Sequence, residues 1–170
     1  VMGKRSDFQR IERDFYPTPY EAVVPLLPHL PDKTVYDEPC AGEGHLIEFL
    51  WEHGHECDYA WDISPPKNYT PKNALDLTFC GGDMFITNPP YDWKILNPLI
   101  THLSDIAQTW LLLPADMMHN IRMGPHMKRC VKVVSVGRVK WFGNQAGKEN
   151  SAWYLFDAIH TGPTTFVGRS

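Results

Sequence analysis

A short apolar run ends in Asn88-Pro89-Pro90-Tyr91, the stretch best suited to chemistry. Consecutive prolines fix φ and remove two backbone donors, so the strand predicted at 84–87 must end there. The Asn88 side-chain oxygen and the Pro89 carbonyl are two acceptors that could converge on one amino group, and Tyr91 offers a ring for stacking. These residues favour a site for a planar amine or amide nitrogen. A plain strand-ending turn is the alternative, because Asn and Pro also favour turns.

A second candidate cluster, Glu38-Pro39-Cys40-Ala41-Gly42-Glu43-Gly44, follows a strand predicted at 35–37. Gly42 and Gly44 allow the backbone to turn tightly and to approach a ligand closely. Apolar residues at helical spacing follow, so a helix would present its positive N-terminal end to that ligand. The pattern is typical of a nucleotide-binding first βα unit, and an ordinary βα turn is the alternative.

Acidic residues follow two further predicted strands. Asp62 ends a strand predicted at 55–61 and lies twenty residues after Gly42, where doubly wound folds place an acid on ribose hydroxyls. Asp76 lies in a short strand predicted at 74–78 and could meet an adenine amino group or cap a turn. Because open α/β sheets bind ligands at the carboxyl ends of their strands, these positions predict one shared site.

The remaining apolar spacing predicts the elements that position this site. We expect one α/β domain, with a mostly parallel central sheet, an antiparallel closing strand and helices on both faces. The other predicted elements are a short helix at 20–30 interrupted by prolines, a loop at 64–73, a helix at 93–106 that Pro98 kinks or divides, a strand at 110–113, a helix from Asp116 through Met123, a strand at 131–136 and a closing hairpin of 137–142 with 152–156.

Length and composition limit the class of protein. At 170 residues the chain fits one domain, and no apolar run approaches a membrane span in length. The first fourteen residues are polar and are expected to be flexible. The four cysteines include no C-x-x-C pair and the histidines show no metal-site spacing, so we expect reduced thiols and no metal. The absence of a secretory signal predicts a cytoplasmic protein with no membrane partner.

Charge is divided along the chain. Residues 37–92 contain eleven acids and two bases, whereas residues 117–150 contain seven bases and one acid. The basic residues could form a face that meets phosphates, with a solvated surface as the alternative. They are Arg122, Lys128, Arg129, Lys132, Arg138, Lys140 and Lys148.

The motifs together resemble a known family. The chain is similar to class I S-adenosylmethionine-dependent amino-methyltransferases, and among them to the small DNA adenine-N6 methyltransferases of phages and prophages. Four motifs stand in the family's order: Phe15-Tyr16-Pro17-Thr18-Pro19, the glycine turn 38–44, the acids Asp62 and Asp76, and Asn88-Pro89-Pro90-Tyr91.

This resemblance implies the Rossmann-like class I methyltransferase fold and a place in the cytoplasm of a bacterium or phage-infected host. It also implies roles for individual residues. Thr18 would hold the methionine carboxylate of S-adenosylmethionine, Glu38 its amine and Asp62 its ribose. The implied cofactor-binding residues are Tyr16, Thr18, Pro19, Glu38, Pro39, Ala41, Gly42, Gly44, Asp62, Ile63 and Asp76. The residues Asn88, Pro89, Pro90 and Tyr91 would be catalytic, and Trp93, Lys140 and Trp153 would border the substrate by analogy. Because a stacked base cannot reach such a pocket, a flipped or single-stranded base is implied.

The sequence also departs from this family. Longer DNA methyltransferases insert a target recognition region, and residues 92–170 leave no room for one, so residues 15–170 are expected to form a single catalytic domain. A partner chain could supply recognition, short loops could read two or three bases, or the enzyme could be indiscriminate. Rival functions are methylation of RNA adenine or of a protein glutamine amide, and a non-catalytic cofactor-binding subunit.

Overall fold

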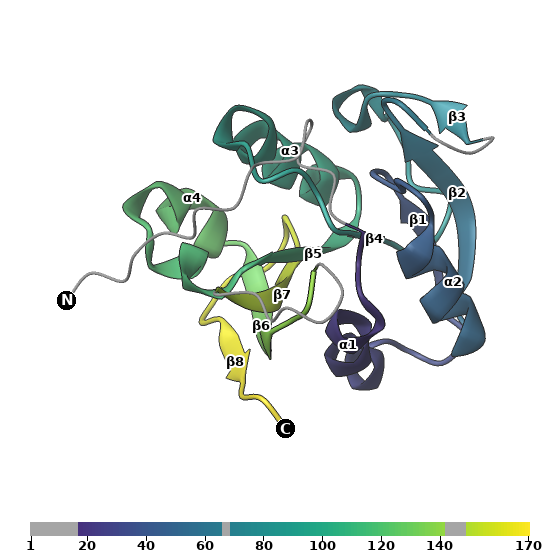
Figure 1. The fold of residues 1–170 in the computed structure, drawn as a ribbon. Coiled ribbons are helices and arrows are strands. Elements are labelled where there is room, and N and C mark those ends of the chain that lie inside the picture. Colours follow the sequence, from purple (N-terminus) through teal and green to yellow (C-terminus); the bar gives the residue numbers. More distant parts are fainter. Residues whose placement is uncertain (1–16, 66–68, 142–148) are drawn as a thin grey trace.

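The computed structural model describes residues 17–65, 69–141 and 149–170 (Figure 1). The predicted flexible segment 1–14, Tyr16 and the predicted hairpin loop 143–147 lie outside the described residues. The strands are β1 (Val35–Glu38), β2 (Glu56–Asp62), β3 (Thr70–Pro71), β4 (Met84–Thr87), β5 (Gln108–Pro114), β6 (Cys130–Arg138), β7 (Asn150–Phe156) and β8 (Thr165–Val167). The helices are α1 (Tyr20–Val23), α2 (His45–Glu52), α3 (Trp93–Ile106) and α4 (Gly124–Met127), with 3-10 helices η2 (Val24–His29), η3 (Ala74–Asp76), η4 (Ala115–His119) and η5 (Ile121–Met123).

All eight strands belong to one sheet in the order β3-β2-β1-β4-β5-β7-β6-β8. The strands β1, β2, β3, β4 and β5 pair in parallel, and β7 pairs antiparallel with both β5 and β6. The edge strand β8 runs parallel to β6. The predicted mostly parallel sheet with an antiparallel closing strand is confirmed.

Helices cover both faces of the sheet (Figure 1). Successive residues of a strand point to opposite faces, so in β4 Phe85 packs with α3 while Met84 and Ile86 pack with α1 and α2. The same alternation in β5 sends Leu111 to the α3 side and Trp110 to the α1 side. Continuous apolar strands buried on both faces are what a covered parallel sheet requires.

Two predicted elements differ from the structure, whereas the helix predicted at 93–106 is α3 with the same bounds. Residues 74–78 do not form a strand, because the Asn73 side chain accepts a hydrogen bond from the Leu75 N–H at 3.0 Å and starts η3 instead. The edge strand β3 forms inside the predicted loop. Pro98 neither divides nor ends α3, which is continuous, and the proline lies on its exposed side.

In the last third of the chain, two further elements differ from the prediction. The predicted helix from Asp116 through Met123 is replaced by η4, η5 and the single turn α4. The first arm of the closing hairpin is the end of β6, which continues to Arg138 by adopting a positive φ of 84° at Gly137. A glycine tolerates that conformation without strain.

Within the described ranges, no helix is long and apolar enough to span a membrane. In the same part of the chain, no cluster of three or more His, Cys, Asp or Glu side chains could hold a metal ion.

Candidate active site

Three of the predicted site residues lie together at the carboxyl ends of the parallel strands. Glu38 ends β1, Asp62 ends β2, and Asn88 follows β4 directly. The strands β1 and β4 are neighbours, and the helices that follow them, α2 and α3, pack on opposite faces. Such a switch point opens a crevice at the carboxyl ends of the strands.

Asp62 holds the glycine turn in place. Its Oδ2 accepts a hydrogen bond from the Gly42 N–H at 2.9 Å, and its Oδ1 accepts one from the Ser64 N–H at 2.8 Å. Gly42 and Gly44 have positive φ values of 53° and 83°, so the turn needs glycine at both positions. Asp62 and the glycine turn, twenty residues apart in sequence, are therefore in direct contact, and the carboxylate fixes the conformation of the turn.

Glu38 is a buried carboxylate, with 2% of its surface exposed. Its Oε1 accepts a hydrogen bond from the Cys40 N–H at 2.9 Å. Burial raises the pKa of Glu38 to about 8, and the nearby charge of Asp62 adds to that shift. The buried Thr87 hydroxyl lies beside the carboxylate and favours its charged form, but makes no hydrogen bond of good geometry within the described residues.

No cationic side chain among the described residues forms an ion pair with Glu38. A buried carboxylate is costly unless a cation or hydrogen-bond donors compensate it. The Glu38 carboxylate and the Thr87 hydroxyl are therefore buried acceptors that suit a bound ammonium group.

Asn88 joins two segments that lie seventy residues apart. Its Nδ2 donates a hydrogen bond to Thr18 Oγ1 at 3.3 Å, and its Oδ1 accepts one from the Tyr91 hydroxyl at 3.2 Å. Thr18 is 6% exposed, so this contact lies within the protein. The two bonds fix the orientation of the Asn88 amide before any substrate binds.

The rest of the motif links β4 to α3. Pro89 is buried and Pro90 is half-buried, whereas Tyr91 packs against the core on the α3 side. Asp92 then caps α3, because its Oδ1 accepts the Lys94 N–H at 3.0 Å. The site is thus built between a strand end and a capped helix start.

The other predicted cofactor contacts are less constrained. Ile63 is 65% exposed beside Asp62, and Asp76 lies on the exposed surface of η3. Pro19 accepts the Ala22 N–H at the start of α1, and Pro39 and Ala41 are buried in the glycine turn. Their roles toward a cofactor stay predictions.

The position of Trp153 contradicts its predicted place at the border of the substrate site. It is fully buried, and its Nε1 donates to the Ala22 carbonyl at 2.7 Å, so its ring is part of the core and cannot stack on a base in this conformation. Lys140 is exposed, and its backbone N–H donates to the Glu21 carboxylate. Trp93 is half-buried two residues after Tyr91, and the Arg122 guanidinium lies 4.3 Å from its ring centroid. The spacing of residues in the sequence does not predict this contact between Arg122 and Trp93.

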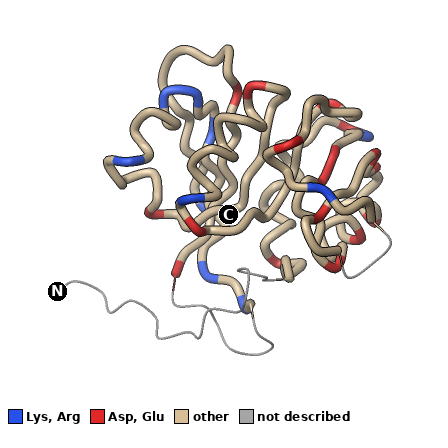
Figure 2. The backbone as a smooth tube through the Cα atoms, turned by 90° about the horizontal axis from the view of Figure 1, so that it is seen from above, with Lys and Arg blue, Asp and Glu red and all other residues tan. Residues whose placement is uncertain are grey.

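The charge division persists in three dimensions. Acidic positions gather on the side of the molecule that carries β1, β2 and α2, and basic positions lie mainly on the other side (Figure 2).

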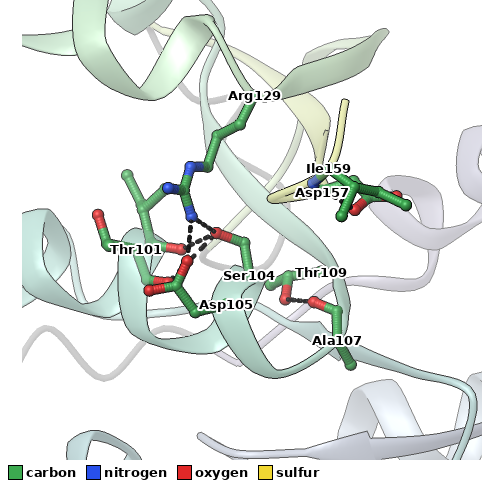
Figure 3. Close-up of polar contacts among 9 residues, drawn as sticks. Thr101, Ser104, Asp105, Ala107, Thr109, Arg129, Asp157 and Ile159 are labelled. Carbon is green, nitrogen blue, oxygen red and sulfur yellow. Dashed lines mark hydrogen bonds and ion pairs between the residues drawn. The ribbon is translucent and has the colours of Figure 1, made fainter. Parts of the chain in front are cut away.

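The basic residues differ in how free they are to meet phosphates. Arg129 is not free, because it donates to Asp105 Oδ1 at 2.6 Å and to Ser104 Oγ at 3.0 Å (Figure 3). Lys132 Nζ lies 3.3 Å from His29 Nδ1. Arg122, Lys128, Arg138 and Lys140 are exposed.

The chain matches no known family of sequences and no curated protein. Its fold does match solved structures. A protein described as a candidate RNA methyltransferase from Pyrococcus horikoshii is 14% identical, with a TM-score of 0.58 over 87% of this chain and 88% of that one. A 1,6-didemethyltoxoflavin-N1-methyltransferase from Burkholderia thailandensis, solved with bound S-adenosylhomocysteine, is 13% identical, with a TM-score of 0.54 over 80% and 76%.

A third similar structure is the methyltransferase subunit of a type I restriction-modification system from Streptococcus thermophilus. It is 11% identical, with a TM-score of 0.54 over 88% of this chain, which spans only 45% of that subunit. At such identities the likeness concerns the fold. The chain has the Rossmann-like fold of methyltransferases, and the predicted fold class is confirmed.

Proposed function

We propose that this chain transfers a methyl group from S-adenosylmethionine to the N6 amino group of adenine in DNA. The observation that supports this best is the position of Asn88, which lies at the end of β4 beside the β1 turn and is hydrogen-bonded to Thr18. The amine-binding motif and the cofactor-binding threonine are therefore direct neighbours. The methyltransferase fold of the similar structures is consistent with this proposal.

The residues of the site fit the cofactor. Glu38 and the Thr87 hydroxyl offer a buried acceptor pair for its ammonium group, and Asp62 still has lone pairs for ribose hydroxyls. Thr18 Oγ1 accepts from Asn88, so its own hydroxyl hydrogen is available to a carboxylate. When bound, S-adenosylmethionine supplies an electrophilic methyl group on a positively charged sulfur.

The motif acts on the amine that receives the methyl group. The adenine N6 lone pair is delocalised into its ring, so the nitrogen is a weak nucleophile. Asn88 Oδ1 and the Pro89 carbonyl would accept its two hydrogens and draw it toward tetrahedral geometry, which frees the lone pair. No base need remove a proton beforehand. Catalysis is then alignment combined with selective binding of the transition state.

One assay tests the substrate class. Purified protein is given S-adenosylmethionine with a labelled methyl group, together with DNA, RNA or a glutamine-containing protein in parallel. We expect label in DNA, recovered as N6-methyladenine after digestion to nucleosides. Label in RNA or protein alone would establish a rival methyltransferase, and cofactor binding without transfer to any of the three would indicate a non-catalytic subunit.

We predict that Asp62→Ala weakens S-adenosylmethionine binding, with a loss of about 1.5–3 kcal/mol for the ribose contact. The Gly42 and Ser64 N–H groups also lose their acceptor, so the melting temperature should fall as well. Asp62→Asn, which keeps one acceptor oxygen, should lie between wild type and Asp62→Ala. Calorimetry that gave unchanged cofactor affinity in Asp62→Ala would remove this residue from the site.

We predict that DNA affinity falls steeply with salt. Short loops can offer few base contacts, so we expect phosphate contacts to provide most of the binding. If about four basic residues engage phosphates, log affinity should fall against log salt with a slope near −3 to −4. Neutralising the exposed Lys128 and Arg138 should flatten this slope without changing which adenines are methylated.

Arg129→Gln is the matched control, because Arg129 is already paired with Asp105 and should change stability more than the salt slope. Mapping of methylated adenines after exhaustive reaction measures sequence preference. A fixed site of about five or more base pairs, each worth ~1–3 kcal/mol of discrimination, would reveal a base-reading surface and contradict the expected loose preference.

A further inference from the structure

The segment between β5 and β6, residues 115–127, is a compact surface element beside the candidate active site. It begins at the carboxyl end of β5, the neighbour of β4. Its first residues are fixed by the buried Tyr154, whose hydroxyl hydrogen-bonds the carbonyls of Pro114 and Ala115 at 2.9 and 3.0 Å. The same hydroxyl accepts the Met118 N–H at 3.2 Å.

The far end of this segment is fixed to the first turns of α3. His126 Nε2 lies 2.7 Å from Asn97 Oδ1, and the His126 ring meets the Trp93 ring edge-on at 5.9 Å. Met123 is fully buried in the core between these contacts. The segment therefore has a defined position relative to Trp93, which starts the helix directly after the Asn88–Tyr91 motif.

At its tip the segment exposes an isoleucine beside an arginine. Ile121 is 96% exposed, the highest fraction among the large apolar side chains of the described residues. The guanidinium carbon of the next residue, Arg122, lies over the Trp93 ring at 4.3 Å from its centroid, so a cation–π contact connects η5 to the site. A tip that combines an exposed apolar side chain with a cation has the chemistry of side chains that enter a base stack next to a phosphate.

We propose that Ile121 is a wedge that enters the DNA duplex and occupies the stack when the target adenine moves into the active site. This inference rests on the proposed function. The partner that fits is duplex DNA, because Arg122 on the segment and Lys128 directly after it provide positive charge, and the proposed amine-binding motif lies next to the segment. Unpairing and unstacking the target costs free energy, which contacts of an inserted apolar side chain can offset.

The wedge affects only a target that must leave a base stack. Ile121→Ala should therefore lower the single-turnover methylation rate on a duplex with a paired target adenine by about tenfold to a hundredfold, the range that corresponds to burial of one isoleucine side chain. The rate on a single strand of the same sequence, and on a duplex with an abasic site opposite the target, should change less than about twofold. Ile121→Leu should retain most of the duplex rate.

The experiment measures these rates for wild type, Ile121→Ala and Ile121→Leu, with 2-aminopurine fluorescence at the target position as a direct readout of unstacking. Ile159→Ala is the matched control, since Ile159 is 87% exposed between β7 and β8. An Ile121→Ala variant with the wild-type duplex rate, or with equal losses on all three substrates, would overturn the wedge. Wild-type protein that methylates none of the three DNA substrates would refute the proposed function itself, and the wedge with it.

Discussion

Replacing Asn88 by alanine should lower methyl transfer by about two to three orders of magnitude while cofactor binding stays close to wild type. The Asn88 amide contributes an acceptor that matters most when the amine nitrogen becomes tetrahedral, so its loss falls on the transition state. Its Nδ2 contact with Thr18 is a single hydrogen bond at 3.3 Å, and losing it should weaken cofactor binding by no more than about 1 kcal/mol. Single-turnover rates and calorimetry on the same preparation separate the two effects.

Tyr91→Phe is the control for this variant. It keeps the ring that would stack on the base and removes only the hydroxyl that donates to Asn88 Oδ1 at 3.2 Å. The loss in rate should therefore be much smaller than for Asn88→Ala. If Asn88→Ala retained near wild-type turnover on its best substrate, activation of the amine by this motif would be wrong.

The contacts of Thr18 explain why the two halves of the site belong together. Thr18 lies in the first described segment, yet its hydroxyl oxygen accepts from Asn88 at the end of β4. A residue implied in cofactor binding thus also orients the amide that would bind the substrate. In the proposed reaction the alignment of cofactor and amine would depend on this contact, because small displacements of reacting groups are costly in rate.

The sequence predicted those parts of the fold that depend on local pattern. The apolar run before Asn88 and the glycine turn after β1 each have a short-range signal, and both stand at strand ends as expected. The sequence predicts a short strand at 74–78 that contains Asp76, whereas Asp76 lies on η3 in the structure. The deciding interaction there is the Asn73 cap on Leu75, which competes locally with strand pairing.

Contacts between distant segments could not be predicted in this way. Trp153 has the aromatic character expected of a base-stacking residue, but its indole N–H meets a carbonyl of α1 that lies 131 residues away in sequence. The sequence predicts Arg129 as part of a free basic face, whereas its guanidinium pairs with Asp105, 24 residues away (Figure 3). The stacking of Arg122 on Trp93 likewise depends on how the segment after β5 folds back on α3.

Glu38→Gln should remove the pH dependence of cofactor binding. Burial raises the pKa of Glu38 to about 8, so below that pH the carboxyl group holds a proton in the cofactor-free protein. A bound ammonium group favours the charged carboxylate, so binding must release that proton. Log affinity should therefore rise by about one unit per pH unit between roughly pH 5.5 and 7.5, and calorimetry at pH 7 in buffers of different ionisation enthalpy should detect about one proton released.

The same group affects the stability of the cofactor-free protein. The pKa of Glu38 is higher in the folded than in the unfolded chain, so the folded state binds more protons between about pH 4.5 and 8 and stability falls as pH rises through that window. The buried Asp37, whose pKa burial also raises, contributes in the same direction, and the comparison with Glu38→Gln isolates the part due to Glu38. Glutamine keeps an acceptor for the Cys40 N–H, so the variant should fold, lose less stability with rising pH and bind S-adenosylmethionine about tenfold to a hundredfold more weakly near pH 8. A Glu38→Gln protein that kept the wild-type pH dependence of affinity would show that another group takes up the proton.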